Sequence, residues 1–121
     1  MGAWIPPGWP RLTPRLFVKQ PAECVAFIKH VFGATGELEQ DRPTTLDVGG
    51  SKIMVSGTGP REATRSSSYV YVPDVDTAYE RALSAGASAI EEPDEMPYGD
   101  RRATVRDPWG NDWQIATHRS P

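Results

Sequence analysis

Two stretches of the chain place apolar residues at the spacing of one helix face. The members of these sets, at i, i+3, i+4, i+7 and i+8, are Cys24, Phe27, Ile28, Val31 and Phe32, and Val75, Ala78, Tyr79, Ala82 and Leu83. This spacing is typical of an amphipathic helix with one buried face. A Gly–Ala pair follows each set, and glycine commonly ends a helix. We therefore predict helices near residues 22–32 and 75–85, with Asp74 or Asp76 capping the second.

Short runs typical of strands surround each predicted helix. One run precedes each helix and three follow it: 15–18, 36–40, 44–48 and 52–56 in the first half, and 68–72, 88–91, 102–106 and 112–117 in the second. The glycines that end the helices, Gly33 and Gly86, are 53 positions apart. A strand-helix-strand-strand-strand order that occurs twice indicates two copies of one βαβββ unit. The sequence therefore predicts an α+β fold of two modules.

The length of 121 residues fits a single domain. The Pro- and Gly-rich N-terminus predicts an extended arm over residues 1–10, and the polar stretch 58–66 predicts a linker between the modules. Module one then covers about residues 11–57 and module two about residues 67–118.

Two motifs carry a resemblance to a known family. One is the turn Asp107-Pro108-Trp109-Gly110-Asn111, followed three residues later by Gln114, and the other is the helix ending Phe27-Ile28-Lys29-His30-Val31-Phe32-Gly33. Together with the duplicated unit, they resemble the glyoxalase / bleomycin-resistance / extradiol-dioxygenase superfamily, also called the vicinal oxygen chelate proteins. The resemblance spans roughly residues 11–118. It implies that each module curls its sheet into half a cup, that the cups enclose a cavity, and that the helices lie outside.

The resemblance also locates the family's metal ligands. Those positions match Thr13, Met54 or Ser56, Ser67 and Gln114, and Gln114 replaces the Glu of the metal enzymes. Catalytic divalent metals prefer imidazole and carboxylate ligands, whereas these four side chains are neutral and weak donors. We therefore expect neither a metal site nor a cofactor.

Strand alternation predicts which side chains face the cup. The apolar positions, expected under the helices, are Leu16, Val18, Ile53, Val55, Val70, Val72, Val105, Trp113 and Ile115. The opposite positions are polar and aromatic, as ligand pockets require. From them and from the loop at Met96–Tyr98, the expected ligand-binding residues are Arg15, Phe17, Met54, Ser56, Tyr69, Tyr71, Tyr98, Arg102, Thr104 and Gln114. No catalytic residue is assigned.

Two histidines and one cysteine are the other reactive candidates. We expect His30 on the exposed side of its helix and Cys24 in the core as a small hydrophobe. His118 is either a surface residue or a contact at the rim of the cup, and it is the natural general base if the protein is catalytic.

Charged and aromatic residues near the closing turn allow alternatives. The acidic run at residues 91–95 is expected to be a solvated loop. Residues 100–102 form either a salt-bridged corner or, through Arg102 with Arg15 or Arg106, an anion clamp. Trp113 is expected in the core, and Trp109 as a cavity wall or dimer contact.

Composition excludes several classes of partner. The net charge of −3 argues against nucleic acid, and no apolar run reaches the roughly 18–20 residues of a membrane span. A single cysteine and the lack of signal-peptide features favour a cytoplasmic protein, and the family resemblance implies a bacterial-type one. Open sheet edges, together with Trp4 and Trp9 on the arm, favour a homodimer.

The preferred functional hypothesis is a metal-free protein of the glyoxalase/bleomycin-resistance type. It would bind a planar or anionic metabolite or drug in the cup. One alternative is a lyase, isomerase or dioxygenase of the same superfamily, with an atypical metal site or cofactor-independent chemistry. A second is a non-catalytic interaction protein with a vestigial pocket.

Overall fold

The structure, a computed structural model, describes residues 4–59 and 62–119. Its elements are β1 (Arg15–Val18), α1 (Pro21–Phe32), β2 (Thr44–Val48), β3 (Ser51–Gly57), β4 (Ser67–Tyr71), α2 (Val75–Ser84), β5 (Ser88–Glu95), β6 (Asp100–Arg106) and β7 (Asp112–His118). Residues 1–3 of the expected arm and 60–61 of the expected linker lie outside the described residues. Both helices and seven of the eight expected strands are present, with bounds that differ by a few residues from the prediction.

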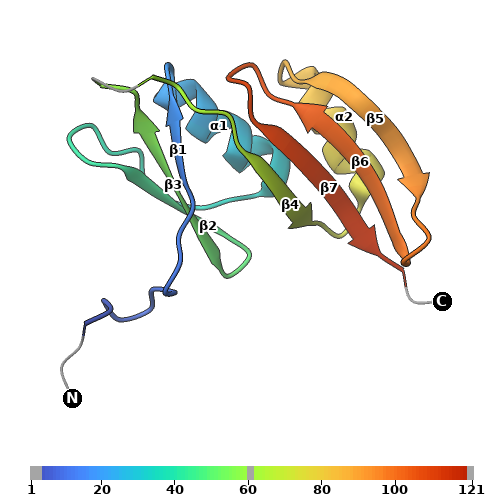
Figure 1. Cartoon of the computed structure of the whole chain (residues 1–121), viewed down its shortest axis with the longest axis horizontal. Coiled ribbons are helices and arrows are strands. Elements are labelled where there is room, and N and C mark those ends of the chain that lie inside the picture. Colours follow the sequence, from blue (N-terminus) through green and yellow to red (C-terminus); the bar gives the residue numbers. More distant parts are fainter. Residues whose placement is uncertain (1–3, 60–61, 120–121) are drawn as a thin grey trace.

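The strands form two mixed sheets that lie side by side (Figure 1), in the orders β1-β3-β2 and β4-β7-β6-β5. In each sheet the first strand of the module runs parallel to the last one, as β1 does to β3 and β4 does to β7. The remaining pairs are antiparallel. This equivalence confirms the α+β fold of two modules built on one plan.

The expected strand at residues 36–40 is wrong. Only an isolated bridge between Thr35 and Asp47 remains there, so the first sheet has three strands. Gly36 has a φ of +145°, and a Cβ added to it would lie 2.5 Å from the carbonyl oxygen of Thr45. The backbone N–H of Glu39 then donates to the hydroxyl of Thr44 at 2.9 Å. The chain therefore leaves the sheet through a conformation that only glycine adopts easily.

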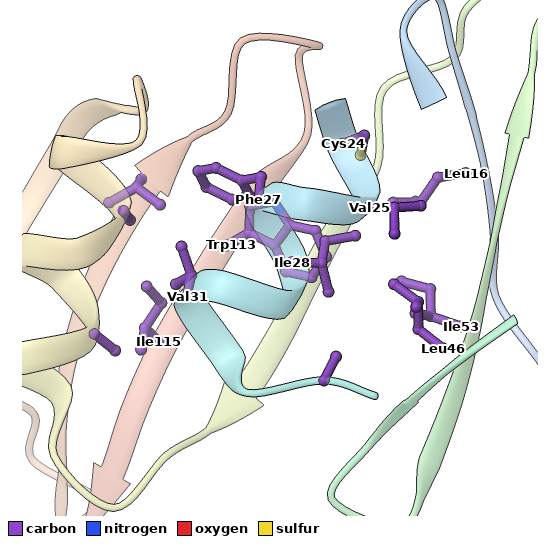
Figure 2. Packing of buried hydrophobic residues seen from close by; sticks show 14 of the residues in the cluster. Leu16, Cys24, Val25, Phe27, Ile28, Val31, Leu46, Ile53, Trp113 and Ile115 are labelled. Atoms are coloured by element: carbon purple, nitrogen blue, oxygen red, sulfur yellow. The ribbon is translucent and has the colours of Figure 1, made fainter. Parts of the chain in front are cut away.

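The first helix lies between the two sheets and forms the core with both (Figure 2). Ile28 and Cys24 of this helix are fully buried. Phe27 meets Trp109 edge-on at 5.9 Å between ring centroids, and Phe32 packs on Trp113 at 5.0 Å. The helix ends at Gly33, whose left-handed backbone (φ 68°) lets its N–H donate to the carbonyl of Lys29. The apolar face of α1 thus joins the two modules.

Two expectations about tryptophan have different outcomes. Trp113 lies in the core, as predicted, with 3% of its surface exposed. Trp109 is partly buried: it packs on Phe27, and its indole N–H donates to the side-chain oxygen of Gln20 at 3.0 Å. Trp109 therefore connects the β6–β7 turn of module two to residues of module one.

The acidic run at residues 91–95 is not the expected loop, because β5 continues through it to Glu95. Its pairing with β6 is irregular, with register shifts between Ala89 and Glu91 and between Glu91 and Asp94. These shifts change which way the acidic side chains point, so that Glu91 and Glu95 reach different arginines of β6.

Candidate ligand-binding face

The sheets have one face covered by helices and one free of them (Figure 1). The predicted alternation holds along the strands: Val105, Trp113 and Ile115 are buried towards the helices. On β4, Val70 packs against the core, whereas Tyr69 and Tyr71 are 39% and 61% exposed. We call the helix-free side the binding face.

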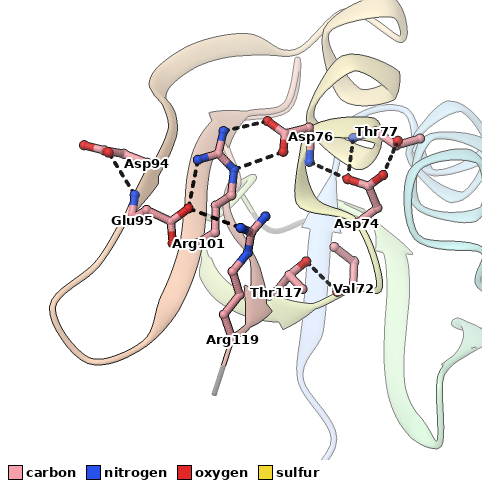
Figure 3. Close-up of polar contacts among 9 residues, drawn as sticks. All are labelled: Val72, Asp74, Asp76, Thr77, Asp94, Glu95, Arg101, Thr117 and Arg119. Carbon is pink, nitrogen blue, oxygen red and sulfur yellow. Dashed lines mark hydrogen bonds and ion pairs between the residues drawn. The ribbon is translucent and has the colours of Figure 1, made fainter. Parts of the chain in front are cut away.

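An ion-pair cluster around Arg101 lies on the helix-covered face of β6 (Figure 3). Arg101 donates to both carboxylate oxygens of Asp76, at 3.0 Å each, and to Glu95 at 3.0 Å. Asp76 stands in the first turn of α2, which Asp74 caps by accepting the backbone N–H of Asp76 and of Thr77. Hydrogen bonds to Asp76 raise the pKa of Arg101, so this cluster stays charged and ties α2 to the sheet.

On the binding face, Asp100 is the centre of a hydrogen-bonded cluster. Although it belongs to a sheet face free of helices, only 2% of Asp100 is exposed. One carboxylate oxygen accepts the hydroxyls of Tyr69 at 2.7 Å and Tyr71 at 2.9 Å. The other lies 2.8 Å from Nδ1 of His118. The bond from Tyr69, and then that from His118, lower the pKa of Asp100, so the carboxylate is ionised at neutral pH.

The cluster continues in one direction to Arg102. A tyrosine hydroxyl has a single hydrogen, and Tyr69 gives its own to Asp100. Tyr69 therefore accepts from the hydroxyl of Tyr98, 3.3 Å away, and Tyr98 accepts from Nη1 of Arg102 at 3.2 Å. Burial, with these bonds, raises the pKa of Tyr69, which keeps it protonated as a donor. The positive end of this chain is Arg102 and the negative end is Asp100.

Arg102 is held by a carboxylate on its other side. Its Nη2 donates to Glu91 at 3.2 Å, and the same Glu91 oxygen accepts the hydroxyl of Thr104 at 2.6 Å. Its Nε is buried and has no hydrogen-bond partner among the described residues. Glu91, Met96 and Arg102 line a cavity of about 420 Å³ at this edge of the sheet.

The two arginines offered as partners of Arg102 in an anion clamp, Arg15 and Arg106, have different surroundings. Arg106 makes a two-pronged pair with Asp112, at 2.6 and 3.0 Å, while Arg102 pairs with Glu91 rather than with Asp100. Arg15 lies in the other sheet. The alternative of a salt-bridged corner at residues 100–102 is correct only in part, because these three side chains have separate partners.

In module one, Arg15 is the charged group of the binding face. Its Nε donates to the hydroxyl of Ser56 at 2.9 Å, and its guanidinium lies 4.9 Å from the ring centre of Phe17. No carboxylate forms an ion pair with Arg15 among the residues that the structure describes. Arg15 and Ser56 line a cavity of about 350 Å³ together with Leu38 and the segment 39–43. This cavity opens where the fourth strand of the module is missing.

The ten expected ligand-binding residues thus fall into two groups. The module-one group is Arg15, Phe17, Met54 and Ser56, and Met54 stands opposite Arg15 in the sheet. The module-two group is Tyr69, Tyr71, Tyr98, Arg102, Thr104 and Gln114, where Gln114 stands between Tyr69 and Thr104. Each cavity is lined by residues of one module.

Three further residues hydrogen-bond to the module-two group: Asp100, His118 and Glu91. For His118 a contact at the rim was one of two alternatives, whereas Asp100 and Glu91 were not predicted as ligand-binding residues. Asp100 shares the alternation of Arg102, which could have placed it on the binding face. Glu91 could not be placed in this way, because the register shifts of β5 break the alternation.

The donor set does not fit the metal site of the family. Thr13, Met54, Ser56, Ser67 and Gln114 provide no imidazole and no carboxylate. In addition, no group of three or more His, Cys, Asp or Glu side chains within residues 4–59 and 62–119 is arranged to hold a metal ion. None of the helices in the described part is long and apolar enough to cross a membrane.

The chain belongs to the Glyoxalase/Bleomycin resistance protein/Dioxygenase superfamily, whose family model matches residues 11–115. This finding confirms the resemblance drawn from the closing turn, the first-helix ending and the repeat.

Solved structures share the fold over nearly the whole chain. TioX from Micromonospora sp. ML1 is 30% identical with a TM-score of 0.76, over 90% of this chain and 98% of that one. A family enzyme from Burkholderia phytofirmans PsJN is 23% identical with a TM-score of 0.73, over 88% and 96% of the two chains. The Mycobacterium bovis protein Mb0911c, described as uncharacterized, is 27% identical over 88% of this chain and 82% of its own.

Proposed function

We propose that the protein binds a planar or anionic metabolite or drug on the binding face without using a metal ion. The observation that carries this proposal is Arg15, a guanidinium next to an aromatic ring and a cavity, with no carboxylate partner among the described residues. An unpaired arginine suits the two oxygens of a carboxylate or phosphate. The family supports the proposal in general terms, since its name includes bleomycin resistance proteins.

The module-two group supplies the planar contacts in this proposal. The rings of Tyr69 and Tyr71 lie 5.5 Å apart at 59° and remain accessible, while their hydroxyls are fixed on Asp100. Tyrosines whose orientation is fixed lose little conformational entropy when a ligand binds. The buried Nε of Arg102 also lacks an acceptor among the described residues, and an oxygen of a ligand would satisfy it.

We further propose that the protein acts as a cytoplasmic homodimer. The two sheets leave edge strands, and Trp4 is 71% exposed on the arm. Trp9 is partly buried, with Lys52 at 5.5 Å from its ring. A second copy would cover such apolar surface. Light scattering at tens of micromolar protein should give the mass of a dimer, and deletion of residues 1–10 should weaken it; a monomer would refute this proposal.

A binding experiment tests the proposed function. A thermal-shift panel of aromatic carboxylates, aromatic sulfonates and neutral polycyclic compounds should contain ligands that raise the melting temperature. Titration calorimetry with the best carboxylate should then show that Arg15→Gln weakens binding by about 1.5–3 kcal/mol, the scale of a hydrogen bond to a charged group. Arg102→Gln should weaken it less, because Glu91 already neutralises that arginine.

Arg81→Gln is the matched control, because this exposed arginine lies on α2, away from the binding face. It should leave the affinity unchanged. A panel without a single stabilising ligand, or equal losses in Arg15→Gln and Arg81→Gln, would refute the proposed function.

A further inference from the structure

His118 has one ring nitrogen fixed and the other unengaged. Nδ1 lies 2.8 Å from Asp100, and an ionised carboxylate can only accept a hydrogen bond. Nδ1 therefore carries a proton and donates it, so that the lone pair of neutral His118 is at Nε2. No partner of Nε2 is present among residues 4–59 and 62–119, and 56% of the side chain is exposed.

Gly99 and Arg119 are the neighbours of the imidazole ring. Gly99, with a φ of +100°, lies against the imidazole: an added Cβ would be 3.4 Å from Cε1 of His118. The adjacent Arg119 pairs with Glu95, at 3.6 Å, and its backbone N–H donates to the carbonyl of Gly99 at 2.7 Å. Tyr69 and Tyr71, on the other oxygen of Asp100, are the remaining titratable groups in contact with this carboxylate.

We propose that His118 is a general base for cofactor-independent proton abstraction from a planar carbon acid bound on the rings of Tyr69 and Tyr71. Asp100 is its positioning residue. A carboxylate that fixes one imidazole nitrogen orients the other towards substrate and stabilises the imidazolium that forms. The substrate class is an aromatic or conjugated carbonyl compound with an acidic hydrogen next to the carbonyl group.

The step balances without an oxidant, a reductant or a metal. Nε2 takes the proton, and the electron pair of the broken C–H bond moves into the conjugated carbonyl as an enolate. Return of the proton from Nε2 to a different carbon completes an isomerisation and restores neutral His118.

The chromogenic carbon acid 5-nitrobenzisoxazole tests the base directly. When a base removes its C–H proton, the electron pair forms the nitrile, the N–O bond breaks and a coloured phenolate is released. Wild-type protein should accelerate this reaction, and His118→Ala should reduce the rate at least about tenfold, since a positioned base contributes 10²–10⁴-fold. His30→Ala is the matched control and should keep the wild-type rate, because His30 is exposed on α1.

Nitrogen-15 NMR of the two histidines provides a readout that does not need a substrate. Neutral His118 should carry its proton on Nδ1, because this nitrogen faces the carboxylate of Asp100. Asp100→Asn should lower the rate and the share of this tautomer. If Asp100→Asn fails to fold, Tyr71→Phe serves as the second variant. It removes one hydrogen bond to Asp100 but keeps the contact between Asp100 and His118, so it should preserve the tautomer.

Two results would overturn the inference: equal elimination rates in wild-type protein and His118→Ala, or a proton of neutral His118 found mainly on Nε2. The inference uses the same face as the proposed binding function, but its failure is distinguishable. Aromatic carboxylates should stabilise His118→Ala as they do the wild-type protein, whether or not His118 acts as a base.

Discussion

The two modules share one topology but differ in how their binding-face groups are held. In module two, four strands present side chains that hydrogen-bond to one another from His118 through Asp100 to Arg102 and Glu91. In module one, three strands present Arg15 beside a cavity, with Ser56 as its hydrogen-bond acceptor. On the binding face, the repeated unit therefore gives one half whose arginine pairs with a carboxylate and one half whose arginine, Arg15, has no carboxylate partner among the described residues.

The difference arises from a few positions rather than from the general pattern. At Gly36 the chain leaves the first sheet, so no strand there corresponds to β5, and none of the described acids pairs with Arg15 as Glu91 pairs with Arg102. The hairpin turns differ too. Asp107 in the β6–β7 turn is buried and binds four donors, whereas Asp47 next to the β2–β3 turn is partly exposed and binds Gly50 and Lys52. Module two is thus the more rigidly specified half.

The largest effect expected from this comparison is that of Asp107→Ala. The carboxylate accepts the indole N–H of Trp113 at 2.9 Å and the backbone N–H and side-chain amide of Asn111 at 2.9 and 3.1 Å. Each buried donor left without an acceptor costs about 1–3 kcal/mol, so the loss of an acceptor for these three donors should lower the free energy of unfolding by at least about 3 kcal/mol. Urea denaturation measures this loss.

Asp47→Ala is the matched variant in module one. It removes a hydrogen bond to the N–H of Gly50, which water can replace at this partly exposed position. The loss of stability should therefore be clearly smaller than for Asp107→Ala. Equal losses would show that the two turns are equally specified and would contradict the contrast between the modules.

A smaller effect is expected in the acid stability of module two. Because the folded state lowers the pKa of Asp100 below its ordinary value of 3.8, its ionised form stabilises the fold. This contribution is complete above about pH 3.8 and is lost as the pH falls through the lowered pKa. Denaturation from pH 7 to pH 2 should show that the advantage of wild type over Asp100→Asn disappears in this range. An advantage that is constant with pH would contradict the assignment.

The smallest effect concerns Cys24, at the joint between the modules. Burial, together with the charge of Asp107, raises the pKa of this thiol to about 12. At pH 8, native protein should therefore react with a disulfide reagent only when the joint opens, because the thiolate is the nucleophile. Asp107→Ala should speed this labelling. Rapid labelling of wild-type protein would show that the modules separate easily.

Periodicity was enough to predict most of the fold. The apolar spacing located both helices within a residue at each end, and strand alternation assigned Leu16, Val105 and Trp113 to the core. These predictions succeed because burial of one face imposes a period on the sequence. The absent strand at 36–40 and the extended β5 were not predictable in this way, since register shifts and a positive φ leave no periodic trace.

The sequence by itself determined the family, the repeated plan of the two modules and which strand residues form the core. Only the tertiary structure decided their partners: Arg102 takes Glu91 rather than Asp100, and Asp100 collects Tyr69, Tyr71 and His118. The physical reason is that the face of a strand residue follows from local alternation, whereas its hydrogen-bond partner depends on which strands are neighbours and in what register. The pairing of β4 with β7 and of β6 with β5 sets these contacts, and they join residues up to 31 positions apart.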